Sequence, residues 1–237
     1  MRGVALPAGA VGVDANLTLN RTIEEHRMSN GSSRHRALVL LGPTGSGKTP
    51  LGDLIEQRGL WGLEWVHFDF GAQLRGIVAQ EGADGEFSPA EVDSLDEVLQ
   101  TGALLEAEQF PLAERILRSF LGRRAPDYST CVVLNGLPRR VEQAKALEPI
   151  VNVGTVLSLR CTSNTIMERV RSNVGGDRAQ RVDDDPAMVL TKLALFNERT
   201  TPLVDHYREL DVPVRRIVVT AAMTPEEIWR ILQHRGC

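Results

Sequence analysis

The segment GPTGSGKT at residues 42–49 constrains the fold of this chain more than any other part of the sequence. It follows ALVLLG, an apolar run that ends on a glycine, and it precedes LGDLIEQRG, whose apolar spacing predicts a helix. In such a loop, glycines let backbone N–H groups point inward at phosphate oxygens, and the new helix adds its positive N-terminal end. A strand, this loop and a helix in succession therefore predict a phosphate-binding loop, or P-loop.

The residues of this loop have separate expected roles. Lys48 is expected to reach the β- and γ-phosphates of a nucleoside triphosphate, and the Thr49 hydroxyl is expected to ligate Mg²⁺. The other residues expected to hold the nucleotide are Gly42, Gly45, Ser46 and Gly47. The motif thus predicts ATP as the phosphate donor and Mg²⁺ as the cofactor.

Apolar runs alternate with helical stretches along the rest of the chain. Strands are predicted at 37–42, 65–70, 130–135, 155–160 and 214–219. Helices are predicted at 51–59, 110–121, 186–210, which Pro202 bends or divides, and 224–233, which opens on the capping box Thr224 to Glu227. Apolar strands joined by helices form parallel sheets with right-handed crossovers. We therefore expect an α/β fold, a three-layer sandwich around a parallel sheet of about five strands.

Composition and charge exclude several classes of protein. The chain has 237 residues and a formal net charge of -4, which is long enough for a packed domain and argues against general nucleic-acid binding. No apolar run approaches the roughly 20 residues that span a membrane. The cysteines, Cys131, Cys161 and Cys237, lack CxxC spacing, which fits a reducing cytoplasm and no zinc site. We predict a cytoplasmic monomer whose partners are small-molecule nucleotides, with no nucleic acid and no membrane.

The N-terminal residues differ from the rest. Residues 1–35 show no sustained periodicity, and SNGSSRH at 29–35 is typical of a flexible linker. We expect residues 1–35 to be a flexible N-terminal extension and residues 36–237 to form one P-loop domain.

Five further segments follow in order along the chain, at residues 67–78, 101–110, 132–148, 167–173 and 181–207. Together with GPTGSGKT at 42–49, they resemble the adenylate kinase-like nucleoside monophosphate kinases. HFDFGAQLRGIV (67–78) resembles the segment that opens the family's monophosphate-binding domain, and TGALLEAEQF (101–110) resembles the stretch that closes it. VVLNGLPRRVEQAKALE (132–148) is similar to the strand with the "DGFPR" signature. MERVRSN (167–173) resembles the helix that leads into the lid. RVDDDPAMVLTKLALFNERTTPLVDHY (181–207) resembles the lid-closing "R-x-DD" segment and the helix carrying "T-x-P-L/V".

The resemblance covers roughly residues 37–233 and implies both architecture and activity. It implies a P-loop kinase fold with a helical monophosphate-binding insert at about 69–111 and a short lid at about 171–183. It also implies Mg²⁺-dependent, reversible transfer of the terminal phosphate of ATP to a nucleoside monophosphate, with AMP as the default acceptor.

Site roles follow from the resemblance residue by residue. It places Arg75 on the family's acceptor-phosphate arginine, Arg169 on the arginine that stacks on adenine, and Gln143 on the glutamine that reads the adenine edge. Phosphoryl transfer develops negative charge on non-bridging oxygens, so cations must converge from several segments. The candidates for catalysis are Lys48, Arg139, Arg181, Arg178 and Lys192. The candidates for acceptor binding are Arg75, Gly136, Arg139, Gln143 and Asp69.

Three departures from the family pattern are informative. Asn135 stands where "DGFPR" has an aspartate, which removes the carboxylate that usually supports the magnesium shell. Phe70-Gly71-Ala72 stands in place of "T-G-D", which removes a hydroxyl near the acceptor base. Lys192 occupies a usual arginine position, and Asn173 occupies the arginine position at the start of the lid, for which Arg178 is a candidate replacement.

Two other interpretations stay open at the level of sequence. Asp69 ends the second predicted strand, close to the position where P-loop kinases of small hydroxylated metabolites carry an aspartate that orients the acceptor hydroxyl. Alternatively, the loss of the carboxylate at Asn135 leaves a nucleotide-binding regulatory module with little turnover.

Overall fold

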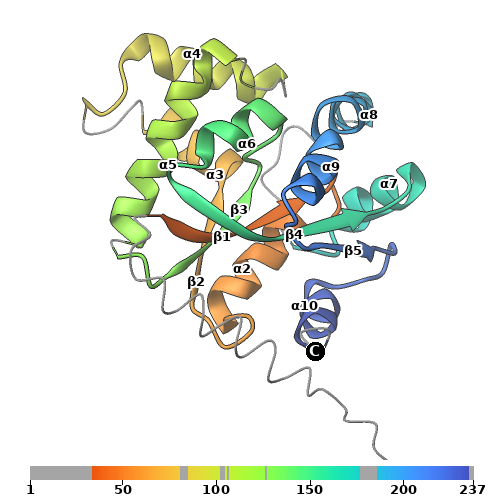
Figure 1. Cartoon of the computed structure of the whole chain (residues 1–237). Helices are drawn as coiled ribbons and strands as arrows, with labels where there is room; N and C mark the ends of the chain where they lie inside the picture. The colour runs from red at the N-terminus through yellow and green to blue at the C-terminus, as the bar shows by residue number, and fades with distance from the viewer. Residues whose placement is uncertain are drawn as a thin grey trace, which may run out of the picture.

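A computed structural model of the protein describes residues 34–80, 85–101, 105, 107–125, 127–176 and 186–234. In these ranges the chain forms a three-layer α/β sandwich, as predicted, with helices on both faces of one sheet (Figure 1). The predicted N-terminal extension up to residue 33 and the lid candidates Arg178 and Arg181 lie outside the described residues.

The sheet has five parallel strands in the spatial order β2-β3-β1-β4-β5. Their bounds are β1 (His35–Leu41), β2 (Trp65–Asp69), β3 (Cys131–Asn135), β4 (Val151–Arg160) and β5 (Val214–Val218). The central strand β1 is almost entirely buried, which explains its continuous apolar run. Because β1 and its neighbours run in the same direction, the P-loop after β1 lies beside the carboxyl ends of β2 and β3.

The fourth strand is longer than the sequence predicted. Val151–Val153 pair with the start of β1, and the register then shifts so that Ala37 faces Val153 while Leu38 faces Thr155. Gly154 is the extra residue at this bulge. The bulge interrupts the apolar pattern, which is why the predicted strand began only at residue 155.

The helices alternate with the strands as expected. In chain order they are α2 (Lys48–Arg58), α3 (Phe70–Ala79), α4 (Pro89–Thr101), α5 (Phe110–Arg124), α6 (Val141–Leu147), α7 (Ser163–Ser172), α8 (Pro186–Leu195), α9 (Pro202–Glu209) and α10 (Pro225–His234). The described ranges also include the 3₁₀ turn η2 (Ala107–Gln109) and the π-helical turn η3 (Phe196–Thr200). No helix in the described ranges combines the length and apolar character needed to cross a bilayer.

Two local predictions about helix ends are confirmed. The long helix predicted over 186–210 is divided by η3, where the Thr201 N–H donates to the Phe196 carbonyl at 3.0 Å, and α9 begins at Pro202. At the start of α10, the Thr224 N–H donates to Glu227 Oε2 at 2.8 Å, and the Glu227 N–H donates to Thr224 Oγ1 at 3.2 Å. Both features depend only on neighbours along the chain.

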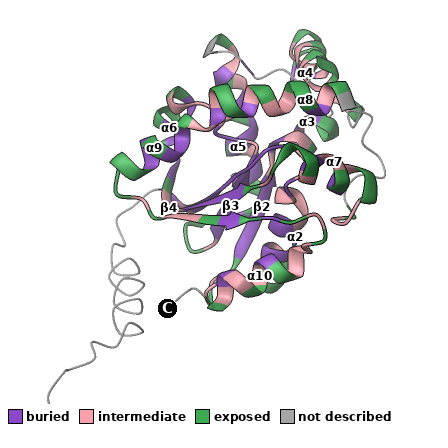
Figure 2. Cartoon of the chain, turned by 90° about the vertical axis from the view of Figure 1, so that its right-hand side faces the viewer, coloured by how far each residue is buried: buried purple, intermediate pink, exposed green. Residues whose placement is uncertain are grey.

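Separate hydrophobic cores fill the two sides of the sheet. On one side, Leu38 and Leu40 of β1 pack with apolar residues of α2 and α10. On the other side, Val39 and Leu41 pack with residues from α3, α5, α6 and α9. Figure 2 shows the buried strands between helices whose outer surfaces are exposed. Alternate residues of one strand thus hold both helical layers, and this fixes the helix-bearing loops over the strand ends.

Candidate active site

The P-loop is held in shape by its glycines and by one buried hydroxyl. Gly45 has a φ of +78° and Gly47 a φ of +92°, both in the left-handed region that favours glycine. A Cβ atom at Gly42 would lie 2.6 Å from Ser46 Oγ. That Ser46 hydroxyl is buried and donates to the Pro43 carbonyl at 2.8 Å. The predicted nucleotide-binding glycines therefore have a conformational reason to be glycine.

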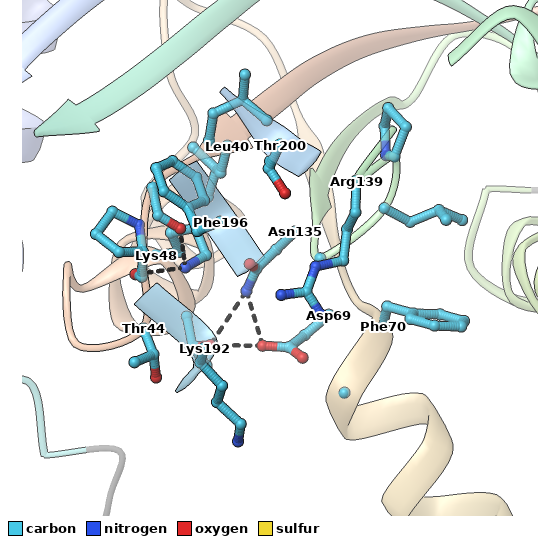
Figure 3. Close-up of a pocket in the computed structure, with 18 of the residues that line it drawn as sticks. Leu40, Thr44, Lys48, Asp69, Phe70, Asn135, Arg139, Lys192, Phe196 and Thr200 are labelled. Carbon is cyan, nitrogen blue, oxygen red and sulfur yellow. Dashed lines mark hydrogen bonds between the residues drawn. The ribbon is translucent and has the colours of Figure 1, made fainter. Parts of the chain in front are cut away.

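A cleft opens between the P-loop, the α3–α4 segment and the α8–η3 segment, above the carboxyl ends of β1, β2 and β3 (Figure 3). It brings together most of the predicted site residues, although they come from widely separated parts of the chain. The predicted residues on its walls are Gly42, Gly45, Gly47, Lys48, Thr49, Asp69, Arg75, Gly136, Arg139, Gln143 and Lys192.

Lys48 is positioned by the loop that it belongs to. Its Nζ atom donates to the Gly42 carbonyl at 2.7 Å and to the Pro43 carbonyl at 2.9 Å. As the first residue of α2, Lys48 also lies at the positive end of that helix. The ammonium group and the helix end together make this edge of the cleft attractive to phosphate.

Three polar side chains meet where α2, β2 and β3 adjoin. The Thr49 hydroxyl donates to Asp69 Oδ2 at 2.5 Å, and Asn135 Nδ2 donates to the same oxygen at 2.8 Å (Figure 3). Asn135 Nδ2 also lies 3.1 Å from Thr49 Oγ1. The other carboxylate oxygen of Asp69 accepts the Ala72 N–H at 2.9 Å and caps α3. Asp69 therefore joins the P-loop to the start of the insert.

This cluster offers donors that fit Mg²⁺. A hydroxyl and a carboxylate are hard oxygen ligands, which Mg²⁺ prefers, and it commonly takes only one or two protein carboxylates beside phosphates and water. In the part of the chain that the structure describes, no group of three or more His, Cys, Asp or Glu side chains could hold a metal. The Thr49 hydroxyl and the Asp69 carboxylate are the oxygen donors that this cluster offers to an Mg²⁺ ion bound to a nucleotide.

A histidine that the sequence analysis did not assign to the site supports this cluster. The His67 ring is buried, its Nδ1 lies 2.8 Å from Asp53 Oδ1, and its Nε2 lies 3.5 Å from Asn135 Nδ2. A Cβ atom at Gly52 of α2 would lie only 2.3 Å from His67 Nε2. Glycine inside a helix costs about 1 kcal/mol relative to alanine, so a glycine in the middle of α2 indicates that another group lies close to the helix there. Gly52 was therefore the feature of the sequence that could have pointed to His67.

Arg139 reaches the cleft from the loop after β3 (Figure 3). Burial, and secondarily the neighbouring charge of Arg140, lower the pKa of Arg139 to about 10, so the guanidinium stays charged at neutral pH. It makes no ion pair with any residue in the described ranges. A half-buried cation without an anionic partner is unfavourable, and a bound phosphate offsets that cost.

Arg75 and Lys192 line the same cleft from two different helices, α3 and α8. Arg75 is exposed on α3, and Gly71 leaves room for its guanidinium, because a Cβ there would lie 3.3 Å from Arg75 Nη1. Lys192 is half-buried on α8. The cleft therefore has cations on several walls, as phosphoryl transfer requires.

Gln143 links two segments beside the cleft. Its Oε1 accepts the Arg139 N–H at 2.8 Å, and its Nε2 donates to the Leu105 carbonyl at 3.4 Å. The amide thereby ties the loop after β3 to the end of the insert. Gly136 in this loop has a φ of +84°, and a Cβ there would lie 3.3 Å from Phe70 Cβ. The contact of Gln143 with an adenine edge stays a prediction.

Arg169 lies behind the P-loop and outside the set of cleft-lining residues. Its buried guanidinium donates through Nε to the Gly45 carbonyl at 3.0 Å, and through Nη1 to the Thr220 carbonyl at 2.8 Å and the Met223 carbonyl at 2.6 Å. These bonds brace the P-loop against the loop between β5 and α10. Its predicted stacking on adenine stays a prediction.

The fold and the site together define a P-loop kinase, a phosphotransferase. A glycine-rich phosphate loop after the central strand, a cleft at the carboxyl ends of parallel strands and converging cations are its defining parts.

Sequence comparison places the chain within this class. No family model matches it. The adenylate kinase of Brucella ovis is 31% identical over 182 residues, which cover 72% of this chain and 84% of that protein. The adenylate kinase of Haloarcula marismortui is 27% identical over 223 residues, which cover 83% of this chain and 94% of that protein. The chain belongs to the adenylate kinase family.

Among solved structures, a gluconokinase from Sinorhizobium meliloti 1021 superposes with a TM-score of 0.48 and 17% sequence identity. The superposition covers 85% of this chain and 91% of that chain.

Proposed function

We propose that this protein transfers the terminal phosphate of ATP to a nucleoside monophosphate, reversibly and with Mg²⁺, and that AMP is the first acceptor to test. The observation that carries the proposal is the pair of arginines, Arg139 and Arg75, on the cleft walls beyond the P-loop. The relatives named adenylate kinase support it.

The arginines favour a phosphate-bearing acceptor over a neutral one. A monophosphate is a dianion at neutral pH, and the guanidinium fork matches phosphate oxygens in a bidentate manner. Binding there would supply Arg139 with the anion that no described residue provides. A neutral hydroxylated acceptor would leave that half-buried cation without a counter-charge.

The competing role of Asp69 as a general base has less support. Its Oδ2 accepts from both Thr49 and Asn135, and its Oδ1 accepts from the Ala72 N–H. Both carboxylate oxygens are thus already engaged in holding Thr49, Asn135 and the start of α3, so Asp69 is bound in a structural network rather than presented to an acceptor hydroxyl.

The proposed roles in the reaction follow from position. Lys48 would exchange the Gly42 and Pro43 carbonyls for the β- and γ-phosphate oxygens. An oxygen of the acceptor phosphate attacks the γ-phosphorus, the bond to the β–γ bridging oxygen breaks, and ADP leaves with that oxygen. Arg139 and Lys192 would offset the charge that develops on the transferred group. We assign the same task to Arg178 and Arg181 of the lid.

The insert at about 69–111 is proposed to hold the acceptor and the short lid at about 171–183 to close over ATP, which would exclude water. Apolar side chains on the insert side of the cleft would contact the base. They are Phe70, Leu74, Val98, Leu99 and Leu105. Phe70 stands where the family pattern has a threonine, so we expect base selectivity to depend on this ring. We further expect a cytoplasmic monomer that acts on small-molecule nucleotides.

The test is a panel of acceptors. Purified protein is incubated with ATP, Mg²⁺ and each of AMP, GMP, CMP, UMP and dTMP, and diphosphates are separated by chromatography. Lys48→Ala serves as the blank. We expect diphosphate from one acceptor above the blank. ATP binding without diphosphate from any acceptor would reject the proposal.

A further inference from the structure

The carboxylate that touches the P-loop threonine comes from β2. Asp69 is the register partner of Asn135 in the parallel β2–β3 pair, so the two side chains end neighbouring strands side by side. Adjacent strands lie about 4.8 Å apart. Asn135 stands where the resemblance to the family expects the carboxylate, and this chain has an acidic side chain one strand away.

Asp69 also lacks a cationic partner. Its hydrogen-bond donors, the Thr49 hydroxyl, the Asn135 amide and the Ala72 N–H, are all neutral. The carboxylate is half-buried, lines the cleft, and makes no ion pair within the described part of the chain. Facing a bound triphosphate, such a charge would be repelled unless a cation lay between them.

The orientation of Asn135 is determined by its neighbours. The side chain is buried, and its Nδ2 points at Asp69 Oδ2, Thr49 Oγ1 and His67 Nε2. An amide in this position supplies no charge, but it directs one oxygen of Asp69 toward Thr49. Two carboxylates at these positions would repel each other at short range, so the acid on β2 and the amide on β3 suit each other.

We propose that Asp69 supplies the carboxylate of the Mg²⁺ shell in this protein and that Asn135 acts as its positioning residue. The negative charge has moved from β3 to β2 while staying beside Thr49. This inference rests on the proposed function only in requiring that Mg²⁺ accompany the bound ATP. It is independent of which acceptor takes the phosphate.

The test measures metal-linked nucleotide binding without any acceptor. The full chain is titrated with the imido analogue of ATP by calorimetry, once with Mn²⁺ and once with EDTA, and bound Mn²⁺ is followed by its electron paramagnetic resonance signal. We expect Asp69→Asn to weaken Mn²⁺-dependent binding by roughly 10–100-fold, the usual effect of losing such a partner. Binding in EDTA should not weaken. Asp205→Asn, which removes an exposed carboxylate of α9 that is paired with Arg208, is the matched control and should keep the Mn²⁺ effect.

The exchange variant decides the matter. Asp69→Asn combined with Asn135→Asp returns the acid to β3, and we expect it to recover most of the roughly 10–100-fold loss in Mn²⁺-dependent binding. Thermal melts establish that each variant is folded. An unchanged Mn²⁺ effect in Asp69→Asn, or a folded exchange variant that does not recover, overturns the proposal.

The outcome is separable from that of the acceptor panel. Loss and recovery of the Mn²⁺ effect without any diphosphate product would support the metal assignment and reject the monophosphate acceptor. If diphosphate is formed but the Mn²⁺ effect on nucleotide binding is the same in Asp69→Asn, the monophosphate acceptor is supported and the metal assignment is rejected.

Discussion

The two walls of the cleft are built differently. On the P-loop wall, Lys48 donates to the carbonyls of Gly42 and Pro43, and Ser46 donates to the carbonyl of Pro43. Arg169 braces this loop from behind through the Gly45 carbonyl. On the facing wall, the Arg75 and Arg139 guanidinium groups make no ion pair with described residues. The donor side is thus defined mainly by backbone shape, and the acceptor side by side chains from separate segments.

This difference explains where the chain departs from the family pattern. A backbone cradle requires a few glycines in fixed conformations and tolerates little change. Side chains that come from separate strands can lose a carboxylate at one strand end and gain one at the next, as at Asn135 and Asp69. The departures at Phe70 and Lys192 likewise fall outside the P-loop.

The largest expected effect comes from the P-loop wall. Lys48→Ala should lower phosphoryl transfer by about 10³-fold or more, because it removes the charge next to the transferred group. The melting temperature should change little, since the P-loop keeps its shape through the bond from the buried Ser46 hydroxyl to the Pro43 carbonyl and through Arg169 on the Gly45 carbonyl. Steady-state kinetics and a thermal melt check this, and near-normal turnover would contradict the division into two walls.

On the acceptor wall, Arg139→Ala should lower kcat/KM for the acceptor by about 10²-fold, and Arg139→Lys should recover only part of it, because lysine lacks the fork geometry. The KM for ATP should stay nearly constant. Arg118→Ala on α5, which removes an exposed arginine paired with Glu114, is the control. An equal rise in the KM for the acceptor and the KM for ATP would show that the two walls of the cleft do not bind separate substrates.

The brace behind the P-loop gives a smaller effect. Arg169→Lys should lose several hydrogen bonds to the carbonyls of Gly45, Thr220 and Met223, each worth about 1.5–3 kcal/mol when the donor is charged, with partial compensation by the ammonium group. We expect a raised KM for ATP and an unchanged KM for the acceptor, measured by initial rates. A change confined to the acceptor would contradict this assignment.

The smallest effects concern two helical glycines. Gly52→Ala should destabilise the protein by about 1–3 kcal/mol in a denaturant titration, because the new Cβ meets the His67 ring. Gly122→Ala in α5 meets nothing within 4 Å and should stabilise it by about 0.4–1 kcal/mol. Equal changes in the free energy of unfolding for the two variants would show that the His67 ring is not held in contact with α2.

Most of the fold could be predicted from the sequence. The strand runs, the P-loop and the division at Pro202 all appear in the structure at or near their predicted positions. The start of β4 could not be found, because the bulge at Gly154 breaks the apolar run and only pairing with β1 defines those residues as strand. In the site, the convergence of Lys48 with Arg139 was expected from the family resemblance and from the chemistry of phosphoryl transfer.

The sequence by itself determined the features that depend on near neighbours. These are the phosphate loop, the helix caps and the apolar periods, each of which acts over a few residues. Only the tertiary structure decided which side chains from distant parts of the chain contact one another. Asp69 and Asn135 meet because β2 lies beside β3, and Arg169 reaches Gly45 across more than a hundred residues of chain. Such contacts depend on strand order and packing, which no local pattern encodes.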